Sequence, residues 1–364
     1  MKKVTFVTVI VSPFQIELTD FINEYLDIDF TTVFTKTRYK GRGEHWKAYK
    51  SKGAKIRIVD VRTKISKIRS LYKTLKSNKP ELIVIGQIRG IVPTVCRFYA
   101  WKNRVPFVFW LEQPFPKKNI FSKTLKDLDC FLNLFGCRAV VGIGNRAVNY
   151  YSRFAPSFMV PYSQDLHFIN KAYEKHKTSD PKVRFLFSGQ LIPRHNIHLI
   201  TGAIEMLYDD IGCEFRFTFA ASGELRHLVD RVLEQRPELN SIIKFDTKYE
   251  EWNDRLKPFF YSDVLVYPSR HSGWGLVIPE ALASGLTIIT TKNVEAARHF
   301  ISDSENGIFI EESVIGLYKS MKRCVEDKKG LESMRMNAIK SYQKGDISSV
   351  GPQLVNHLLE LIED

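Results

Sequence analysis

The chain has 364 residues, of which 44% are hydrophobic and 26% charged, and its formal net charge is +14. This length predicts two domains rather than one core, and the composition excludes a disordered or fibrous protein. No apolar run is long enough to span a membrane, and five scattered cysteines argue against a disulfide framework or a zinc site.

Strand-like apolar runs alternate with helical patterns through the first half, which predicts a parallel sheet wound with helices. The run after Met1 is interpreted as a first strand, because no small-residue cleavage site of a secretion signal follows it. We therefore expect a cytoplasmic protein. The predicted strands are 4–11, 30–34, 56–61, 82–85, 107–110 and 139–143, the helices are 15–25, 65–77 and 145–154, and 156–164 is a connector.

The second half restarts the same alternation, so we expect a second sheet of the same kind. Its final segment, 348–362, has the spacing of an amphipathic helix. The predicted strands are 183–187, 215–220, 242–245, 264–267, 287–290 and 307–310.

The excess of basic over acidic residues is confined to the first half. Residues 1–170 hold 29 basic and 12 acidic residues, whereas residues 171–364 hold 25 and 28. Residues 36–79 alone hold 16 basic residues, interleaved with Tyr39, Trp46, Tyr49 and Tyr72. Such a surface attracts an acidic membrane, a lipid phosphate or a nucleic acid, and a solvated helix face without a ligand is the alternative.

Residues 268–285 join the predicted strand 264–267 to a helix that begins near Leu276. The first amides of a helix have no intrahelical partner and favour anions, and Gly273 and Gly275 let a ligand approach the backbone. Glu280, about one turn further on, can accept hydrogen bonds from vicinal hydroxyls such as those of a ribose. A loop that only packs, with Glu280 at the surface, is an equal alternative from the spacing alone.

Residues 261–312 resemble the signature segment of the family 4 glycosyltransferases, whose pattern is E-G-W/F-G-x-x-x-x-E-A-x-A-x-G, and Phe185 to Arg194 resembles their donor-phosphate loop. These are retaining enzymes of the GT-B fold. The resemblance implies an α/β protein of two Rossmann-like, doubly wound parallel sheets that face each other across a cleft. It implies an acceptor domain at 1–163, a nucleotide-sugar domain at 164–345, and a helix within 346–364 that crosses back to the first domain.

The donor-phosphate loop departs from the family pattern. The family places an Arg after the first Gly and a Lys before a second Gly, both on the diphosphate. This chain keeps Gly189 but has Gln190 at the Arg position and His195-Asn196 at the Lys-Gly pair. The resemblance then leaves Arg194 to compensate the phosphate charge, with His195 helping when protonated. A degenerate loop in a weak or inactive enzyme is the alternative.

The signature segment departs at one position, where Ser272 replaces the first Glu of the family pattern. That Glu holds hydroxyls of the transferred sugar, so the serine implies a different sugar preference. Glu280, the second Glu, is expected to hold the ribose. The other expected donor contacts are Ser222 and the backbone amides of Gly273, Trp274, Gly275 and Leu276.

On the acceptor side, polar residues follow three predicted strands, where an open α/β sheet borders its ligand crevice. Glu112 lies near the place where relatives put a His or Glu that faces the sugar, so it could polarise the acceptor or hold a donor hydroxyl. A helix-start carboxylate or ion-pair partner is an equal alternative. Phe14, Gln15, Gln87 and Arg89 are the expected acceptor contacts.

Two other motifs suggest a cofactor or a metal. Gly142 to Ala147 fits G-x-G-x-x-A, with Asp165 downstream, which leaves a nicotinamide site as a minor alternative. Asp127-Leu-Asp129 mimics a metal-binding D-x-D motif but falls in an apparent helix beside Lys123 and Lys126. We expect no metal and no cofactor.

The interpretation that unites these features is a metal-independent, retaining glycosyltransferase with Arg194, Glu112 and Ser272 as catalytic residues. It would move a hexose from a nucleotide-diphosphate donor to a glycan or lipid-linked acceptor, in cell-surface polysaccharide or glycolipid synthesis at the inner face of the membrane, with no nucleic acid as partner. Two alternatives remain: a nucleic-acid-binding or scaffold protein on a degenerate frame, and a nucleotide-sugar epimerase or phosphorylase.

Overall fold

The computed structural model describes residues 1–37, 51, 53, 55–59, 63–114, 120–176 and 181–363. The chain divides into two compact units, residues 1–164 with 347–364, and residues 165–346. Tyr39, Trp46 and Tyr49, and with them much of the basic stretch 36–79, lie outside the described residues.

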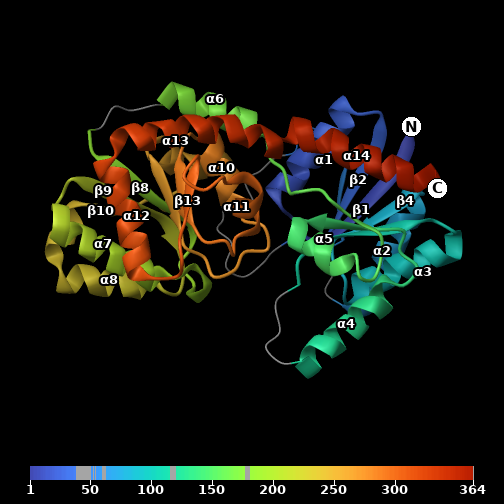
Figure 1. Cartoon of the computed structure of the whole chain (residues 1–364). Coiled ribbons are helices and arrows are strands. Elements are labelled where there is room, and N and C mark those ends of the chain that lie inside the picture. Colours follow the sequence, from blue (N-terminus) through green and yellow to red (C-terminus); the bar gives the residue numbers. More distant parts are fainter. Residues whose placement is uncertain are drawn as a thin grey trace. The chain divides into compact units, whose positions relative to one another are not determined.

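Unit 1 contains a seven-stranded sheet in the order β3-β2-β1-β4-β5-β6-β7, in which every pair of neighbours is parallel. Helices cover both faces of the sheet (Figure 1). Because the strand order reverses between β1 and β4, this is the switch point at which doubly wound sheets bind ligands. The strands are β1 Lys2–Ile10, β2 Ile28–Lys36, β3 Ile56–Ile58, β4 Leu82–Ile85, β5 Phe107–Glu112, β6 Val140–Ile143 and β7 Ser157–Met159, and the helices are α1 Pro13–Tyr25, α2 Lys64–Asn78, α3 Ile91–Asn103, α4 Ile120–Leu134, α5 Asn145–Tyr151 and α14 Ile347–Glu363.

Two strands of unit 1, β7 and β3, differ from the prediction. The segment predicted as a connector contains β7, which pairs with β6 from Val140↔Ser157 to Gly142↔Met159. The third strand ends at Ile58 rather than at residue 61. An edge strand of three residues carries too short an alternation to be recognised.

The last helix, α14, returns to unit 1 and packs on α1. Its buried side chains include Val350, Leu354 and Leu358. Gly351 permits the close approach, since a Cβ at this position would lie 2.7 Å from a ring carbon of Phe21 in α1. The apolar face of α14 thus completes the hydrophobic core of unit 1.

Unit 2 contains a six-stranded parallel sheet in the order β10-β9-β8-β11-β12-β13, with its switch point between β8 and β11. The strands are β8 Val183–Gln190, β9 Phe215–Ser222, β10 Ile243–Phe245, β11 Val264–Tyr267, β12 Thr287–Thr290 and β13 Gly307–Phe309. The helices are α6 Leu166–His176, α7 Ile197–Ile211, α8 Arg226–Gln235, α9 Lys257–Phe260, α10 Val277–Ala283, α11 Glu295–Phe300, α12 Val314–Glu326 and α13 Lys328–Ser341, and the 3-10 turns are η2 Pro193–His195, η3 Pro237–Ser241, η4 Trp252–Leu256 and η5 Tyr342–Gly345.

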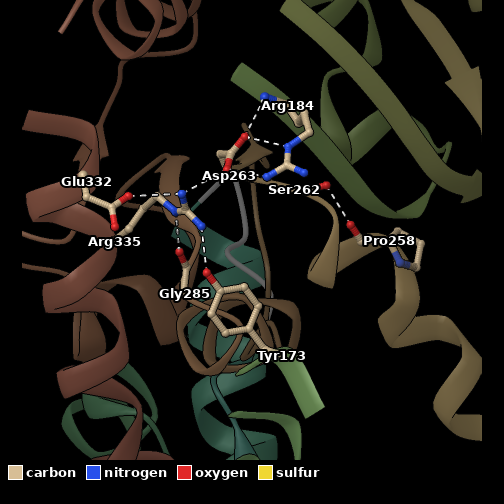
Figure 2. A network of polar contacts seen from close by, with 8 residues as sticks. All are labelled: Tyr173, Arg184, Pro258, Ser262, Asp263, Gly285, Glu332 and Arg335. Carbon is tan, nitrogen blue, oxygen red and sulfur yellow. Dashed lines mark hydrogen bonds and ion pairs between the residues drawn. The ribbon is translucent and has the colours of Figure 1, made fainter. Parts of the chain in front are cut away.

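A buried ion-pair network, shown in Figure 2, joins β8 and β11 at their amino ends. The Asp263 carboxylate accepts from the backbone amide of Arg184 at 3.0 Å and from its guanidinium at 2.9 Å, and it lies 3.0 Å from Arg335 of α13. Arg335 also donates to the Gly285 carbonyl oxygen and to the Tyr173 hydroxyl. The network therefore holds together the two strands of the switch point, and it does so at their amino ends.

No helix among the described residues is both long enough and apolar enough to cross a bilayer.

Candidate functional site

Most of the predicted donor residues lie at the carboxyl edge of the unit 2 sheet, around the switch point. Gly189 and Gln190 end β8, Ser222 ends β9, and the loop that contains Ser272 follows β11. The loops are hydrogen-bonded to each other, because the Arg194 carbonyl oxygen accepts from the Arg270 amide at 2.8 Å. The sequence-predicted donor residues of unit 2 therefore come from three loops at one edge.

The turn after β9 lies against the loop after β8. The Leu191 amide donates to the Ser222 carbonyl oxygen at 2.9 Å, and the Leu225 amide donates to the Leu191 carbonyl oxygen at 2.9 Å. A Cβ on Gly223 would lie 2.6 Å from that carbonyl oxygen, and this residue has φ +153. Only glycine therefore fits, and the contact holds the exposed Ser222 beside the phosphate-loop candidates.

The loop after β8 places Arg194 and His195 in different environments. The Arg194 side chain is exposed, and its Nε donates to His195 Nε2 at 3.3 Å. The His195 ring is 2% exposed and packs at 5.0 Å from the Tyr267 ring. Arg194 is thus the solvent-facing cation of this loop.

Burial and the neighbouring Arg194 lower the pKa of His195 from 6.5 to about 3. The imidazole is therefore neutral at pH 7, and the expectation that a protonated His195 adds positive charge is wrong at this pH. Because Nε2 accepts from Arg194, the ring proton is assigned to Nδ1. This Nδ1 is buried and has no hydrogen-bond partner within the part of the chain that the structure describes.

The loop before α10 presents unused amide groups. In the described part of the chain, the amides of Gly273, Trp274, Gly275 and Leu276 have no hydrogen-bond acceptor. Gly275 has φ +101, and a Cβ there would lie 2.9 Å from a methyl carbon of Val294. Glycine therefore allows a turn that leaves consecutive N–H groups for a ligand.

The Trp274 and Ser272 side chains are held within unit 2. The indole is 2% exposed and lies edge-on to Phe300 with the ring centroids 5.8 Å apart, so the ring itself belongs to the core. Only the backbone of Trp274 remains a ligand candidate. Ser272 is also buried, and its amide donates to the Asn293 carbonyl oxygen at 3.3 Å.

Glu280 lies in the first turn of α10 and is only 7% exposed, so the surface alternative is wrong. Its Oε1 accepts from the Arg255 guanidinium at 2.7 Å. Arg255 in turn stacks on Trp252, with its guanidinium carbon 3.6 Å from the ring centroid. A carboxylate offers about four acceptor sites on its two oxygens, so Glu280 can hold a hydroxyl while Arg255 fixes its orientation.

Arg255 is a site residue that the sequence alone does not indicate. It precedes Glu280 by 25 residues and lies in the short turn η4, where Glu251 and Asp254 form a capping box. The Trp-x-x-Arg spacing suits a stacked pair, but nothing local points to its acidic partner. Only the fold brings the two charges together.

The acceptor candidates of unit 1 differ in their exposure to solvent. Glu112 ends β5 with an exposed side chain, and its carbonyl oxygen accepts from the Tyr151 hydroxyl at 3.2 Å. Phe14 and Gln15 begin α1 and are both buried, and the Phe14 ring packs 4.8 Å from that of Tyr162. The buried Phe14 ring therefore contributes to packing.

Gln87 and Arg89 follow β4. The Gln87 amide donates to the Arg89 carbonyl oxygen at 3.1 Å, and Arg89 Nε lies 2.5 Å from the Asp129 carboxylate. Asp127 is also occupied, because it accepts from Tyr150 at 2.7 Å and from Arg153 at 2.6 Å. Each carboxylate of the D-x-D mimic thus has a cationic partner.

Comparison with known proteins shows that unit 2 is similar to one enzyme family. Residues 169–341 match the family described as Glycosyl transferases group 1. The matched segment lies within unit 2 and spans just under half of the chain. The match supports glycosyl transfer as the activity. No curated protein matches the chain.

Solved structures resemble the whole chain. The sucrose-phosphate synthase of Thermosynechococcus elongatus has a TM-score of 0.76 at 12% identity, with all of both chains covered. HepE of Anabaena in complex with UDP has a TM-score of 0.72 at 13% identity, with 99% of this chain and 100% of that one covered. A glycosyltransferase from Rickettsia africae has the same score and identity, with 100% and 99% covered. These likenesses show that the chain has an α/β fold of the GT-B type.

Proposed function

We propose that the protein transfers a hexose-type sugar from a nucleotide-diphosphate donor to a glycan or lipid-linked acceptor, with retention of the anomeric configuration. The observation that carries the proposal is the group of four amides from Gly273 to Leu276, which have no acceptor among the described residues, in the loop that leads to the paired Glu280 carboxylate. Amide groups suit the oxygens of a diphosphate, and a held carboxylate suits the hydroxyls of a ribose. The structural relative HepE, solved with UDP and glucose, supports a nucleotide sugar as the donor.

Arg194 is proposed to compensate the negative charge that grows on the departing diphosphate. Its guanidinium is exposed at the carboxyl edge of the sheet, and it remains charged at any physiological pH. Because His195 is neutral, charge compensation is proposed to come from Arg194 in the loop after β8 and from the amides in the loop after β11. No metal ion is part of the proposal, and Ser272 is proposed to contact the transferred sugar.

In the proposed reaction the acceptor hydroxyl oxygen forms a bond to the anomeric carbon, and the bond from that carbon to the diphosphate oxygen breaks. The acceptor proton passes to an oxygen of the leaving diphosphate, on the face from which that group departs. In unit 1, Glu112 is proposed to position the acceptor hydroxyl. The protein contributes positioning and charge stabilisation rather than a nucleophile. Because the proposed acceptor is a glycan or is linked to a lipid, we propose a role in the synthesis of cell-surface polysaccharide or glycolipid.

Thermal shift with nucleoside diphosphates tests the donor site. A ligand at 100 times its Kd stabilises the native state by about 2.7 kcal/mol, which raises the Tm of a domain of this size by about 5–10 °C. Glu280→Ala and Arg194→Ala should each abolish the shift, whereas Arg231→Ala, an exposed arginine on α8, should keep it. A shift that persists in both site variants would refute the assignment of the donor site. Transfer itself is measured separately, as acceptor-dependent release of nucleoside diphosphate.

A further inference from the structure

The outer face of α4 is apolar, although it is exposed. Leu125, Leu128, Phe131, Leu132 and Phe135 are each more than half exposed. At about 100° per residue, these positions fall within one arc of roughly 120° around the helix and its end. Soluble proteins seldom leave a continuous stripe of this kind unpartnered.

Unit 1 does not need this stripe for its own packing. The opposite side of α4 contributes the buried residues Cys130 and Leu134 to the core. On that side, Asp127 also receives the hydrogen bond from Tyr150 of α5. The helix therefore has one apolar side for the core and a second apolar side turned away from it.

Helix α3 extends the apolar surface. Trp101 is 78% exposed, and Phe98, also more than half exposed, lies with its ring 6.2 Å from that of Trp101. The two helices are joined where Arg97 donates to the Asn133 carbonyl oxygen at 3.1 Å. A hollow of about 610 Å³ lies between them, lined by Trp101 and by Phe135 among others. We call these exposed apolar residues of α3 and α4 the α3–α4 face.

The charges around the α3–α4 face are mainly positive. Among the described residues of 91–138, six are basic and three are acidic. Lys102, Arg104, Lys123 and Arg138 are exposed. Two of the three acidic residues, Asp127 and Asp129, are paired with Arg153 and Arg89. The partner that complements this face is therefore apolar with a negatively charged rim.

We propose that the α3–α4 face docks on the surface of an anionic lipid bilayer. Leucine and aromatic side chains would enter the boundary between headgroups and acyl chains, and the cations at the rim would meet lipid phosphates. Exposed tryptophan is favoured at that boundary, because its ring is apolar and its N–H is polar. The inference extends the proposed lipid-linked acceptor, but its test requires neither donor nor transfer.

Sedimentation with vesicles tests the inference. The full-length protein is mixed with vesicles of phosphatidylcholine that contain either no phosphatidylglycerol or about one third of it. The double variant Trp101→Ser/Phe135→Ser should bind the anionic vesicles about tenfold or more weakly than the wild type. The variant Arg104→Glu/Arg138→Glu should lose binding to a similar degree, and salt should weaken the wild type.

A matched control is available in unit 2. Ile315 and Met336 are each 56% exposed, so Ile315→Ser/Met336→Ser removes two exposed apolar side chains elsewhere and should bind vesicles as the wild type does. A cooperative thermal transition within a few degrees of the wild-type Tm shows that each variant is folded. If the proposed donor function fails instead, vesicle binding is still measured by itself.

Quenching by brominated acyl chains locates the contact. Wild-type fluorescence should be quenched on anionic vesicles, and Trp101→Phe should lose most of the quenching while it still sediments. Equal vesicle binding by the wild type and Trp101→Ser/Phe135→Ser would overturn the proposal, as would failure of the wild type to bind. A wild-type dimer that this double variant dissociates would assign the face to a second copy and would also overturn it.

Discussion

Removal of the Asp263 carboxylate should destabilise unit 2 far more than removal of an exposed ion-pair partner. Asp263→Ala leaves Arg184 and Arg335 without their shared carboxylate, although both guanidinium groups are largely buried. Breaking a buried pair by removing one partner costs about 3–5 kcal/mol, and the Arg184 amide also loses an acceptor. For a domain of this size, this lowers the Tm by about 6–20 °C.

Calorimetry of the full-length protein measures the effect, with Asp230→Ala as the control. Asp230 pairs with Arg226 on the exposed face of α8, where such a pair is worth about 0–1 kcal/mol. The Asp263→Ala protein should still bind nucleoside diphosphate below its Tm, because Asp263 lies at the opposite edge of the sheet from the candidate site. Equal Tm values for Asp263→Ala and Asp230→Ala would refute the assigned contribution of the network.

Three further predictions concern the candidate site. Because the fold keeps His195 neutral, the free energy of unfolding should fall as the pH drops below about 6.5. Urea unfolding of His195→Gln should show a decrease between pH 7 and pH 5 that is about 2 kcal/mol smaller than that of the wild type. An unchanged pH dependence would contradict the buried neutral ring. Gly275→Ala should cost about 1–3 kcal/mol and weaken nucleoside diphosphate binding, whereas Gly212→Ala, which also has positive φ but open space, should leave binding intact. Equal affinities would argue against a ligand at that turn. Arg255→Gln removes the cationic partner of Glu280 and should weaken binding about tenfold or more by calorimetric titration, and wild-type affinity would refute the role of the pair.

Much of the architecture follows from local sequence patterns. The strands 82–85, 264–267 and 287–290 have the predicted bounds, because short apolar runs between polar or turn residues are buried on both faces of a parallel sheet. Helix α3 was not predicted. Pro93 suggests a break, but it falls in the first turn, where no hydrogen bond is lost.

The site was less predictable than the sheets that carry it. The loops at Gly189 and Gly275 could be located, because glycine and the strand-to-helix pattern mark them in the sequence. The burial of His195 could not, since it depends on Phe187 and Tyr267 from two different strands. The pairing of Glu280 with Arg255 likewise depends on long-range packing rather than on spacing.

The return of α14 to unit 1 has a consequence for synthesis of the chain. Unit 2 is continuous and can fold as soon as it has left the ribosome, whereas unit 1 has to wait for its last seventeen-residue helix, Ile347–Glu363. Until then the nascent N-terminal segment exposes apolar side chains of α1, Phe21 among them, that this helix later covers. Unit 1 is therefore begun first but completed last, and premature termination before Ile347 should yield a product that chaperones retain.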